Sequence, residues 1–562
     1  MLFVVKDGPK FRYLGLLYWF IKHLQATANE LCGKETNVYK PMKFFSLKVI
    51  YCLHFDPQPV GSDSVEVKLS FLSVKQVKYG NAGGITNAIE ESFNDVEQSI
   101  SSSLTSVGIL PYHKKLVGFT SDGASVNRGC NNSIVTRLQE KSPWMVFIWC
   151  IAHRLELALS DALKTTEFQD VDNMLLKMYL LHKKAPKKVR QLKELHDLYK
   201  ETMEFDEGGI KPKKSSGSRW ISHKLAAMKM CLDKWGLYIQ HLETMTEDET
   251  ITSKDKAKLK GYLKHWKSSS MPLLLALFID ILTIPSILSL TFQQEKIDPV
   301  QTARALNKVR ERLAQFEKKV FERLPNVRNF LSKIKEVDAQ FFYQNVKLSS
   351  FERHKVSVES KKNEYLEKIR QCLTNRLEQE DEGEEILDAV VQILDCEGWK
   401  DDNEFAEDAI FAVYDKFEVP LKSGGMSVTV PDLLNQWHEI VDFAVETIGV
   451  TGQSYLITWR KIFSAPRSKG WKDALILVEL LFTIPVSNTK LERMFSKLKR
   501  MKTNFRCSLS LRRLSTMSSD ESDSETAEKE NHESDKENED VQEESTEETE
   551  SQSLFSDSEE EP

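Results

Sequence analysis

The hydrophobic pattern of residues 44–162 alternates strands with helices. Apolar residues fill 44–55 and alternate with polar ones over 65–77, which predicts two strands. Two shorter apolar runs, 115–120 (KLVGFT) and 145–149 (MVFIW), predict two more. Helical spacing of apolar residues predicts three helices, at 85–96, 125–141 and 154–162. The predicted order is therefore β, β, α, β, α, β, α.

The pattern beyond residue 162 is helical almost throughout. Apolar residues at helical spacing predict a long helical region over 172–204, and the spacing continues from 233 to 474. The longest apolar segment, 271–292, contains Asp280 and Pro285. A charge and a proline favour a buried helix of a soluble core over a membrane span.

An RNase H-like α/β core interrupted by a large all-α insertion would produce this order of elements. The expected parts are an unassigned helical segment at 1–43, the first part of the core at 44–232, the insertion at 233–473, the returning end of the core at 474–516 and a tail at 517–562.

Charge separates the tail from the rest of the chain. Residues 520–562 hold twenty acidic residues and two lysines, a net charge of −18, whereas the whole chain carries −7. Residues 1–519 therefore carry +11. So acidic a segment, poor in apolar residues, cannot bury enough surface to offset its ordering entropy, and we expect it to be disordered. The basic remainder favours a partner that offers phosphates.

The cysteines and the amino-terminal residues argue against several protein classes. The eight cysteines are scattered and form no CxxC pair, which disfavours a disulfide framework and a four-ligand zinc finger. Residues 1–26 mix charges into their apolar run and lack a small-residue cleavage site, so we expect no signal peptide. These features predict a reduced, intracellular protein with no membrane span.

Two acidic residues are candidates for metal-assisted chemistry. Asp122 follows the strand 115–120 at a strand-to-helix turn, where α/β folds place catalytic groups. Glu492 lies in a helical segment, 485–498, and such carboxylates can hold paired divalent ions about 4 Å apart for phosphodiester transfer. Two structural alternatives stay open: Asp122 as a turn residue that caps the next helix, and Glu492 as a solvated helix residue.

Further candidates come from basic, aromatic and Cys/His positions. Arg219 and Trp220 follow a flexible loop, and such a pair suits gripping phosphate and stacking on a displaced base. The loop contributes Lys213 and Lys214, and the alternative for Trp220 is a core position. Cys150 and His153 have no second Cys/His pair at finger spacing, so packing at a strand-to-helix corner is favoured over zinc ligation.

Four segments of the chain resemble the hAT superfamily of DNA transposases. They are Gly118–Ser125 (GFTSDGAS), Cys150–Leu157 (CIAHRLEL), Ser218–Trp220 (SRW) and Ile484–Arg506 (IPVSNTKLERMFSKLKRMKTNFR). The four occur in the family's order, and the resemblance as a whole covers roughly residues 44 to 515. More narrowly, the chain is similar to the zinc-finger-protein group of vertebrate host genes derived from these transposases.

The resemblance implies an RNase H-like fold with a helical insertion and a dimerisation region at the carboxyl end of residues 474–516. Asp122 matches the family's second catalytic carboxylate and Glu492 the third. Arg219 and Trp220 match the pair associated with a flipped base, and Cys150 and His153 match a structural CxxH element. The helix of Glu492 would pack and dimerise through Leu491, Met494, Phe495 and Leu498.

The chain also departs from the family. Members carry the first catalytic Asp just before the second strand, whereas here residues 44–47 run directly into 48–51 with no such Asp, and Asp56 is not a convincing replacement. A site with only two of the three carboxylates should bind its metal pair poorly. Charge stabilisation by the metals is the main source of the rate of phosphodiester transfer. The sequence shows no BED-type zinc finger, and the acidic tail begins so soon after Thr516 that the dimerisation region looks short.

The leading hypothesis is a domesticated, catalytically inactive nuclear protein that binds DNA or chromatin partners and self-associates. It needs no cofactor, and Mg²⁺ or Mn²⁺ would matter only with residual activity. A residual nuclease or strand transferase using Asp56 is one alternative. A protein scaffold linked to SUMO is another, although Leu554 and Phe555 make a poor SUMO-binding motif. Nuclear entry is predicted from 183–190 and 497–502, which are equally compatible with solvated helix faces.

Overall fold

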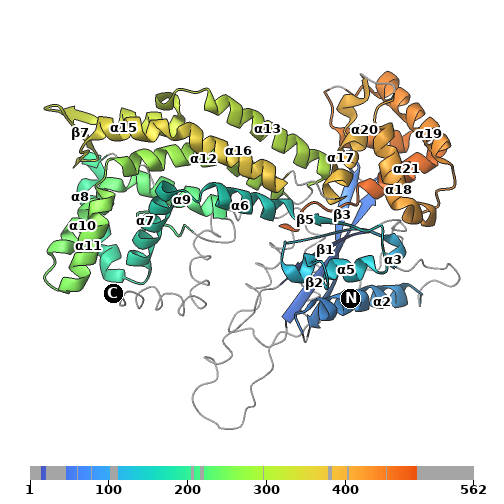
Figure 1. The fold of residues 1–562 in the computed structure, drawn as a ribbon, viewed down its shortest axis with the longest axis horizontal. Helices are drawn as coiled ribbons and strands as arrows, with labels where there is room; N and C mark the ends of the chain where they lie inside the picture. The colour runs from blue at the N-terminus through green and yellow to red at the C-terminus, as the bar shows by residue number, and fades with distance from the viewer. Residues whose placement is uncertain are drawn as a thin grey trace, which may run out of the picture.

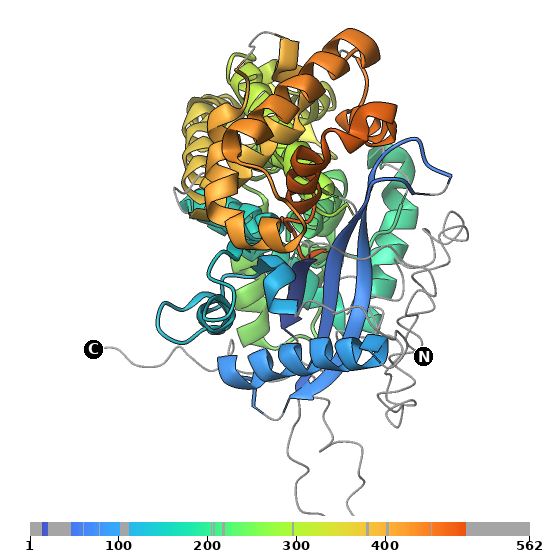
Figure 2. The same ribbon diagram turned by 90° about the vertical axis from the view of Figure 1, so that its right-hand side faces the viewer.

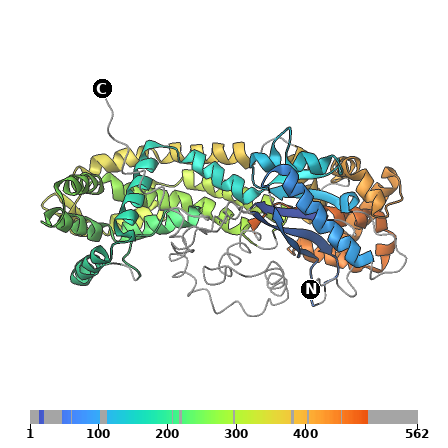
Figure 3. The same cartoon turned by 90° about the horizontal axis from the view of Figure 1, so that it is seen from below.

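The computed structural model describes residues 14–20, 46–59, 61–77, 79–101, 112–203, 205, 208–215, 220–294, 297–377, 382–400, 404–450 and 452–489. Within these ranges the protein is mostly helical. Arg219, Leu491, Glu492, Met494, Phe495, Leu498 and the acidic tail lie outside the described residues. The elongated molecule has a lobe that contains the larger sheet at one end and a helical lobe at the other (Figure 1). Figure 3 shows the same two lobes from below.

The sheet lobe is built on five strands in the order β3-β2-β1-β4-β5. Their bounds are β1 Leu14–Phe20, β2 Ser46–Asp56, β3 Glu66–Val77, β4 Leu116–Ser121 and β5 Val146–Trp149. β2 is antiparallel to β1 and β3, whereas β1, β4 and β5 are mutually parallel. The four strands predicted from the sequence are confirmed to within two residues at each end.

The central strand β1 corrects the expectation of a helical segment at 1–43. Its sequence, LGLLYWF, is apolar along its whole length. A strand in the middle of a sheet reads as a continuous apolar run, and periodicity alone does not distinguish such a run from a buried helix. Pairing decides the structure here, because Leu16 lies opposite both Cys52 of β2 and Phe119 of β4.

Short helices and one long helix lie on one face of the sheet. They are α2 Ala82–Ser101, α3 Tyr112–Lys115, α4 Ser125–Arg128 and α5 Ile134–Gln139. Figure 2 shows α2 lying across the long strands. The single helix expected at 125–141 is therefore divided in two. Gly129 ends the first, and Ser133 caps the second by accepting a hydrogen bond from the backbone N–H of Thr136.

Helices near the carboxyl end of the described chain cover the opposite face. They are α17 Glu382–Leu394, α18 Glu407–Ser423, α19 Val430–Phe443, α20 Tyr455–Ser464 and α21 Lys472–Leu481. Val146 and Ile148 pack with this group, whereas Phe119 and Phe147 pack with α2, as the alternation of side chains along paired strands requires. Residues 382–473 thus pack with the sheet, although the sequence pattern assigned them to the insertion.

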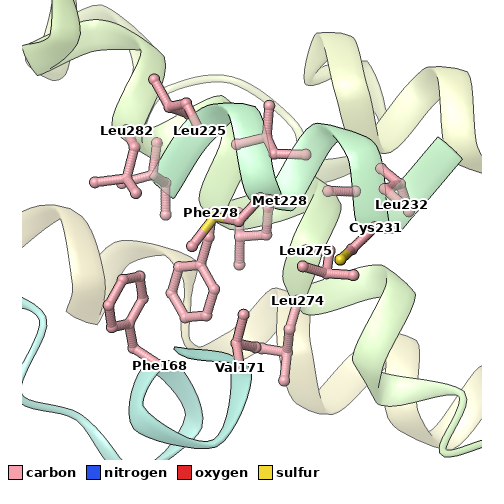
Figure 4. Close-up of a cluster of buried hydrophobic side chains, with 14 of the residues drawn as sticks. Phe168, Val171, Leu225, Met228, Cys231, Leu232, Leu274, Leu275, Phe278 and Leu282 are labelled. Carbon is pink, nitrogen blue, oxygen red and sulfur yellow. The ribbon is translucent and has the colours of Figure 1, made fainter. Parts of the chain in front are cut away.

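The helical lobe contains α6 to α16. Its helices are α6 Ile151–Ala162, α7 Thr166–Lys183, α8 Pro186–Met203, α9 Trp220–Asp233, α10 Trp235–Glu247, α11 Ser253–Trp266, α12 Ser270–Phe292, α13 Pro299–Glu317, α14 Pro325–Ser332, α15 Phe351–Ser360 and α16 Lys362–Leu377. The central helix is α12, whose Leu275 and Phe278 meet side chains such as Phe168 and Met228 (Figure 4). Residues 151–232, expected in the first part of the core, belong to this lobe by packing.

The apolar helix α12 is a core helix, as its sequence predicts. Among the residues that the structure describes, it alone is long and apolar enough to cross a membrane, and 78% of that apolar window is buried inside the protein. Asp280 lies on it and accepts hydrogen bonds from the backbone N–H groups of Asn326 and Val327. The buried carboxylate therefore caps α14, which explains how the helix tolerates a charge.

A three-stranded sheet interrupts the otherwise helical lobe and is a correction to the expected pattern. Its strands are β6 Lys335–Val337, β7 Gln340–Tyr343 and β8 Val346–Lys347. The Tyr343 hydroxyl donates to the carbonyl of Leu232, and Gln344 accepts a hydrogen bond from the backbone N–H of Gly236. The hairpin thus fixes the corner between α9 and α10. Strands of two to four residues are too short for alternation to reveal them.

Candidate functional site at the sheet edge

The candidate site lies at the carboxyl edge of β4 and β5. Ser121 and Trp149, the last residues of the two strands, lie opposite each other. The carbonyl of Ser121 accepts a hydrogen bond from the backbone N–H of Cys150 at 3.0 Å. Because parallel strands end at the same edge, the polar residues that follow them, Asp122 and His153, come together here.

Asp122 is held by its own turn. Its Oδ1 accepts hydrogen bonds from the side-chain amide of Asn127 at 2.6 Å and from the backbone N–H of Ala124 at 3.1 Å. Burial lowers the pKa of His153, and the nearby Asp122 carboxylate opposes that shift. The half-buried carboxylate therefore stabilises the strand-to-helix turn, the role that the sequence left open beside a catalytic one.

Cys150 connects this edge to the segment that precedes Glu492. Its buried thiol donates to Oδ1 of Asn488 at 2.9 Å, and the backbone N–H of Ile151 donates to the carbonyl of Val486 at 3.1 Å. A Cβ added to Gly118 would lie 2.5 Å from Cδ of Pro485. Residues 485–488 thus cross the sheet edge in tight contact with β4 and α6. This contact gives Cys150 a packing role, as its sequence context favoured.

Trp149 closes the edge on the side of Gly123. A Cβ added to Gly123 would lie 2.5 Å from the indole, so any other residue at this turn requires the Trp149 ring to shift. The guanidinium carbons of Arg128 and Arg154 lie 5.2 and 6.0 Å from the centre of the Trp149 rings. Two cations on one indole are within the range of cation–π attraction. Sequence reasoning missed both arginines; their nearness to the SDGAS and CIAHR motifs was the available signal.

Arg154 connects the sheet edge to the segment where the chain leaves the helical lobe, between α16 and α17. Its side chain is buried, donates from Nε to the carbonyl of Arg376 at 2.5 Å and forms an ion pair with Glu384. Arg376 in turn pairs with Asp161 of α6 at 2.7 Å. Buried and half-buried charges therefore join α6, which begins at the sheet edge, to the junction of α16 with α17.

Three of the residues predicted to contact DNA, Lys213, Lys214 and Trp220, lie in the helical lobe, and the fourth, Arg219, lies outside the described residues. Trp220 begins α9 and is half-buried, with its rings 6.5 Å from those of Phe168 and 5.0 Å from the ammonium group of Lys224. This environment matches the core alternative for Trp220. Lys213 is exposed and Lys214 is half-buried, both in the loop 208–215.

The described donor atoms do not fit a two-metal site. The described ranges contain no group of three or more His, Cys, Asp and Glu side chains placed to hold a metal ion. Among the described residues, Asp122 is the candidate metal-binding carboxylate at this edge, and β1 contributes none because its sequence is LGLLYWF. Glu492 lies outside the described residues. No family model matches the chain.

Proposed function

We propose that the protein is a transposase-derived nuclear protein of the hAT type that binds DNA or chromatin partners, self-associates and carries out no strand transfer. The strand order β3-β2-β1-β4-β5, with β2 antiparallel and a helical lobe inserted after β5, supports an RNase H-like core. The net charge of +11 on residues 1–519 supports a phosphate-bearing partner.

One observation carries the inactive assignment. In the family that the chain resembles, the opening strand supplies the first catalytic Asp. The strand in that central position here is Leu14–Phe20, which contains no acidic residue. With one of three carboxylates missing, a metal pair lacks one of its ligands. The charge stabilisation that the two metals would supply to the transition state is then lost.

Strand register argues against Asp56 as a substitute acid. Thr120 of β4 lies level with Leu17 of β1, which in turn lies level with Tyr51 of β2. Asp122 is two residues beyond that level, and Asp56 is five residues beyond it in the opposite direction, because β2 is antiparallel. At about 3.3 Å per residue the two carboxylates are roughly 20 Å apart along the strands. Such a separation exceeds what a shared metal pair allows.

An endonuclease assay tests the inactive assignment. Purified full-length protein with Mg²⁺ or Mn²⁺ is incubated with DNA that carries hAT transposon ends, and nicked and joined products are measured. We expect neither product. Metal-dependent products that disappear in Asp122→Ala would refute the assignment, provided that Asp122→Ala unfolds at the same urea concentration as the wild-type protein.

Duplex binding as a function of salt tests the DNA-binding assignment. Because phosphate contacts release counterions, the affinity of the full-length protein should fall steeply between about 50 and 200 mM salt. Absence of binding at the lowest salt would instead favour a scaffold that contacts proteins.

Sedimentation of Leu491→Asp and Phe495→Asp tests self-association, and we expect both to shift the protein toward monomer.

A further inference from the structure

Basic residues gather where α7 meets α8. From 183 to 193 the chain holds six basic residues and no acidic one. They are Lys183, Lys184, Lys187, Lys188, Arg190 and Lys193. Because α7 ends at Lys183 and α8 begins at Pro186, the run turns a helix-helix corner and continues along α8. This corner lies in the helical lobe, at the end away from the larger sheet (Figure 1).

A second basic segment lies beside this corner. It comprises Lys211, Lys213 and Lys214 of the loop 208–215. The loop is fixed to α10, because the Tyr238 hydroxyl donates to the carbonyl of Ile210 at 3.0 Å, and α10 packs against α8. Lys188 and Lys211 both act electrostatically on the buried His182. The two segments, 183–193 and 211–214, therefore form one surface, which we call the basic corner.

Several cations of the basic corner are available to a ligand. Lys187, Arg190, Lys211 and Lys213 are exposed. Lys187 lies 3.5 Å from Asp248, whereas the other three form no ion pair within the part of the chain that the structure describes. Burial lowers the pKa of the half-buried Lys188, and Asp255 opposes that shift. An anion bound here would lower the cost of holding these charges together.

We propose that the basic corner is the surface that holds the phosphate backbone of duplex DNA. The proposal deepens and rests on the proposed function, because it names which face of the protein meets the nucleic acid. Lysine and arginine side chains presented by a helix and an adjacent fixed loop are suited to contact phosphates without reading base sequence. Lys213 and Lys214, predicted from the sequence to contact DNA, belong to this surface, whereas Trp220 is engaged in the helical lobe's core.

The folded state of the basic corner favours nucleic acid over an import receptor. Residues 187–190 lie in the first turns of α8, which Pro186 begins. A receptor that binds an extended basic peptide would have to unwind those turns, whereas DNA would meet the cations as the fold presents them. The tertiary contact of Ile210 also brings together two basic segments about twenty residues apart, which a linear peptide signal does not require.

A matched pair of charge variants tests the proposal. The corner variant is K187Q/R190Q/K211Q/K213Q, and the control is K461Q/R467Q/K469Q/K472Q, which removes the same number of exposed charges from the sheet lobe. The probe is a short fluorescent duplex of arbitrary sequence, with a single strand of equal length beside it. Affinity of the full-length proteins is measured by anisotropy between about 50 and 200 mM salt.

The expected result is a loss of duplex affinity of about tenfold or more in the corner variant. The slope of log affinity against log salt should fall by about 0.9 for each phosphate that the variant no longer neutralises. The control variant should lose little duplex affinity. Equal affinities in the two variants would overturn the proposal and leave the proposed function standing, whereas a wild-type protein that binds no duplex would overturn both. Loss of single-strand binding alone would overturn the assignment to duplex. Unchanged DNA binding with lost nuclear entry would instead make the corner an import signal.

Discussion

The sheet edge and the basic corner both gather charged side chains, but those charges contact different things. At the sheet edge, Asp122 accepts hydrogen bonds from its own turn and Arg154 is buried against Glu384. At the basic corner, Lys211 and Arg190 are exposed and form no ion pair among the described residues. A buried charge is already compensated by its protein partners, and removing one of them is costly, whereas an exposed excess of charge is available for binding. The site that sequence motifs mark most clearly is thus the one whose charges the fold already uses.

Arg154→Met should cause the largest loss of stability. The side chain is 2% exposed, and the substitution removes the cation that pairs with Glu384, which is only 19% exposed. Breaking a buried pair typically costs about 3 to 5 kcal/mol. The matched control is Arg370→Met, which breaks pairs between side chains about a third or more exposed and should cost no more than about 1 kcal/mol. Urea unfolding measures both, and similar losses would show that the edge is not held as described.

The buried pair His182 and His241 beneath the basic corner should make the protein less stable in acid. His182 donates from Nδ1 to the carbonyl of Met178, its Nε2 lies 3.1 Å from Nδ1 of His241, and burial lowers the two pKa values to about 4 and about 3. In the unfolded chain both protonate near pH 6.5, so the unfolded state binds more protons below that pH.

Stability contributed by the neutral pair is therefore complete above pH 6.5 and is lost as the pH falls toward 4. The slope should be about 1.4 kcal/mol per pH unit for each histidine. Urea unfolding of His182→Leu/His241→Leu between pH 7 and pH 5 measures it, and a lower slope than in the wild type is expected. His54 of the sheet lobe, whose pKa burial also lowers to about 4, should retain part of the slope in the variant. A slope unchanged by the double substitution would contradict the prediction.

Gly123→Ala tests how tightly the sheet edge is closed. The new Cβ would lie 2.5 Å from the Trp149 indole, and such overpacking costs about 1 to 3 kcal/mol. Gly261→Ala is the control, because nothing lies within 4 Å of its Cβ position on α11. Alanine should stabilise that helix by about 0.5 to 1 kcal/mol. Thermal unfolding should therefore move in opposite directions in the two variants, and a neutral Gly123→Ala would mean that Trp149 moves away freely.

Sequence reasoning succeeded where the signal was local and was wrong where distant contacts decide. The four predicted strands are confirmed because three are bounded apolar runs and the fourth, 65–77, alternates apolar with polar residues. The strand Leu14–Phe20 was missed because its pairing with β2 and β4, not its pattern, makes it a strand. Both roles of Asp122 were foreseen, but the hydrogen bond from Asn127 that favours the turn role depends on geometry.

The basic corner shows the same limit of sequence reasoning. Both basic runs are visible in the sequence, and one of them, 211–214, contains Lys213 and Lys214, which the sequence assigned to DNA. Their proximity was not predictable, because it depends on the hydrogen bond between Tyr238 and Ile210 and on the packing of α10 against α8. Spacing along the chain carries no information about such contacts.

Deleting residues 517–562 should produce the smallest of the predicted effects, a change in affinity for duplex DNA. It tests whether the charges of the basic corner, unlike those of the sheet edge, are available for binding. The tail from 520 onward carries −18, which lowers the potential that a phosphate backbone meets at the basic corner. The truncated protein should bind duplex DNA a few-fold more tightly at low salt, and the gain should vanish near 1 M salt because screening then extends only about 3 Å. The same deletion in the K187Q/R190Q/K211Q/K213Q variant should give a smaller gain, because fewer cations remain for the tail to oppose. An equal gain in both backgrounds would mean that the tail opposes DNA binding at some other part of the protein. The exposed charges that bind DNA would then lie on a surface other than the basic corner.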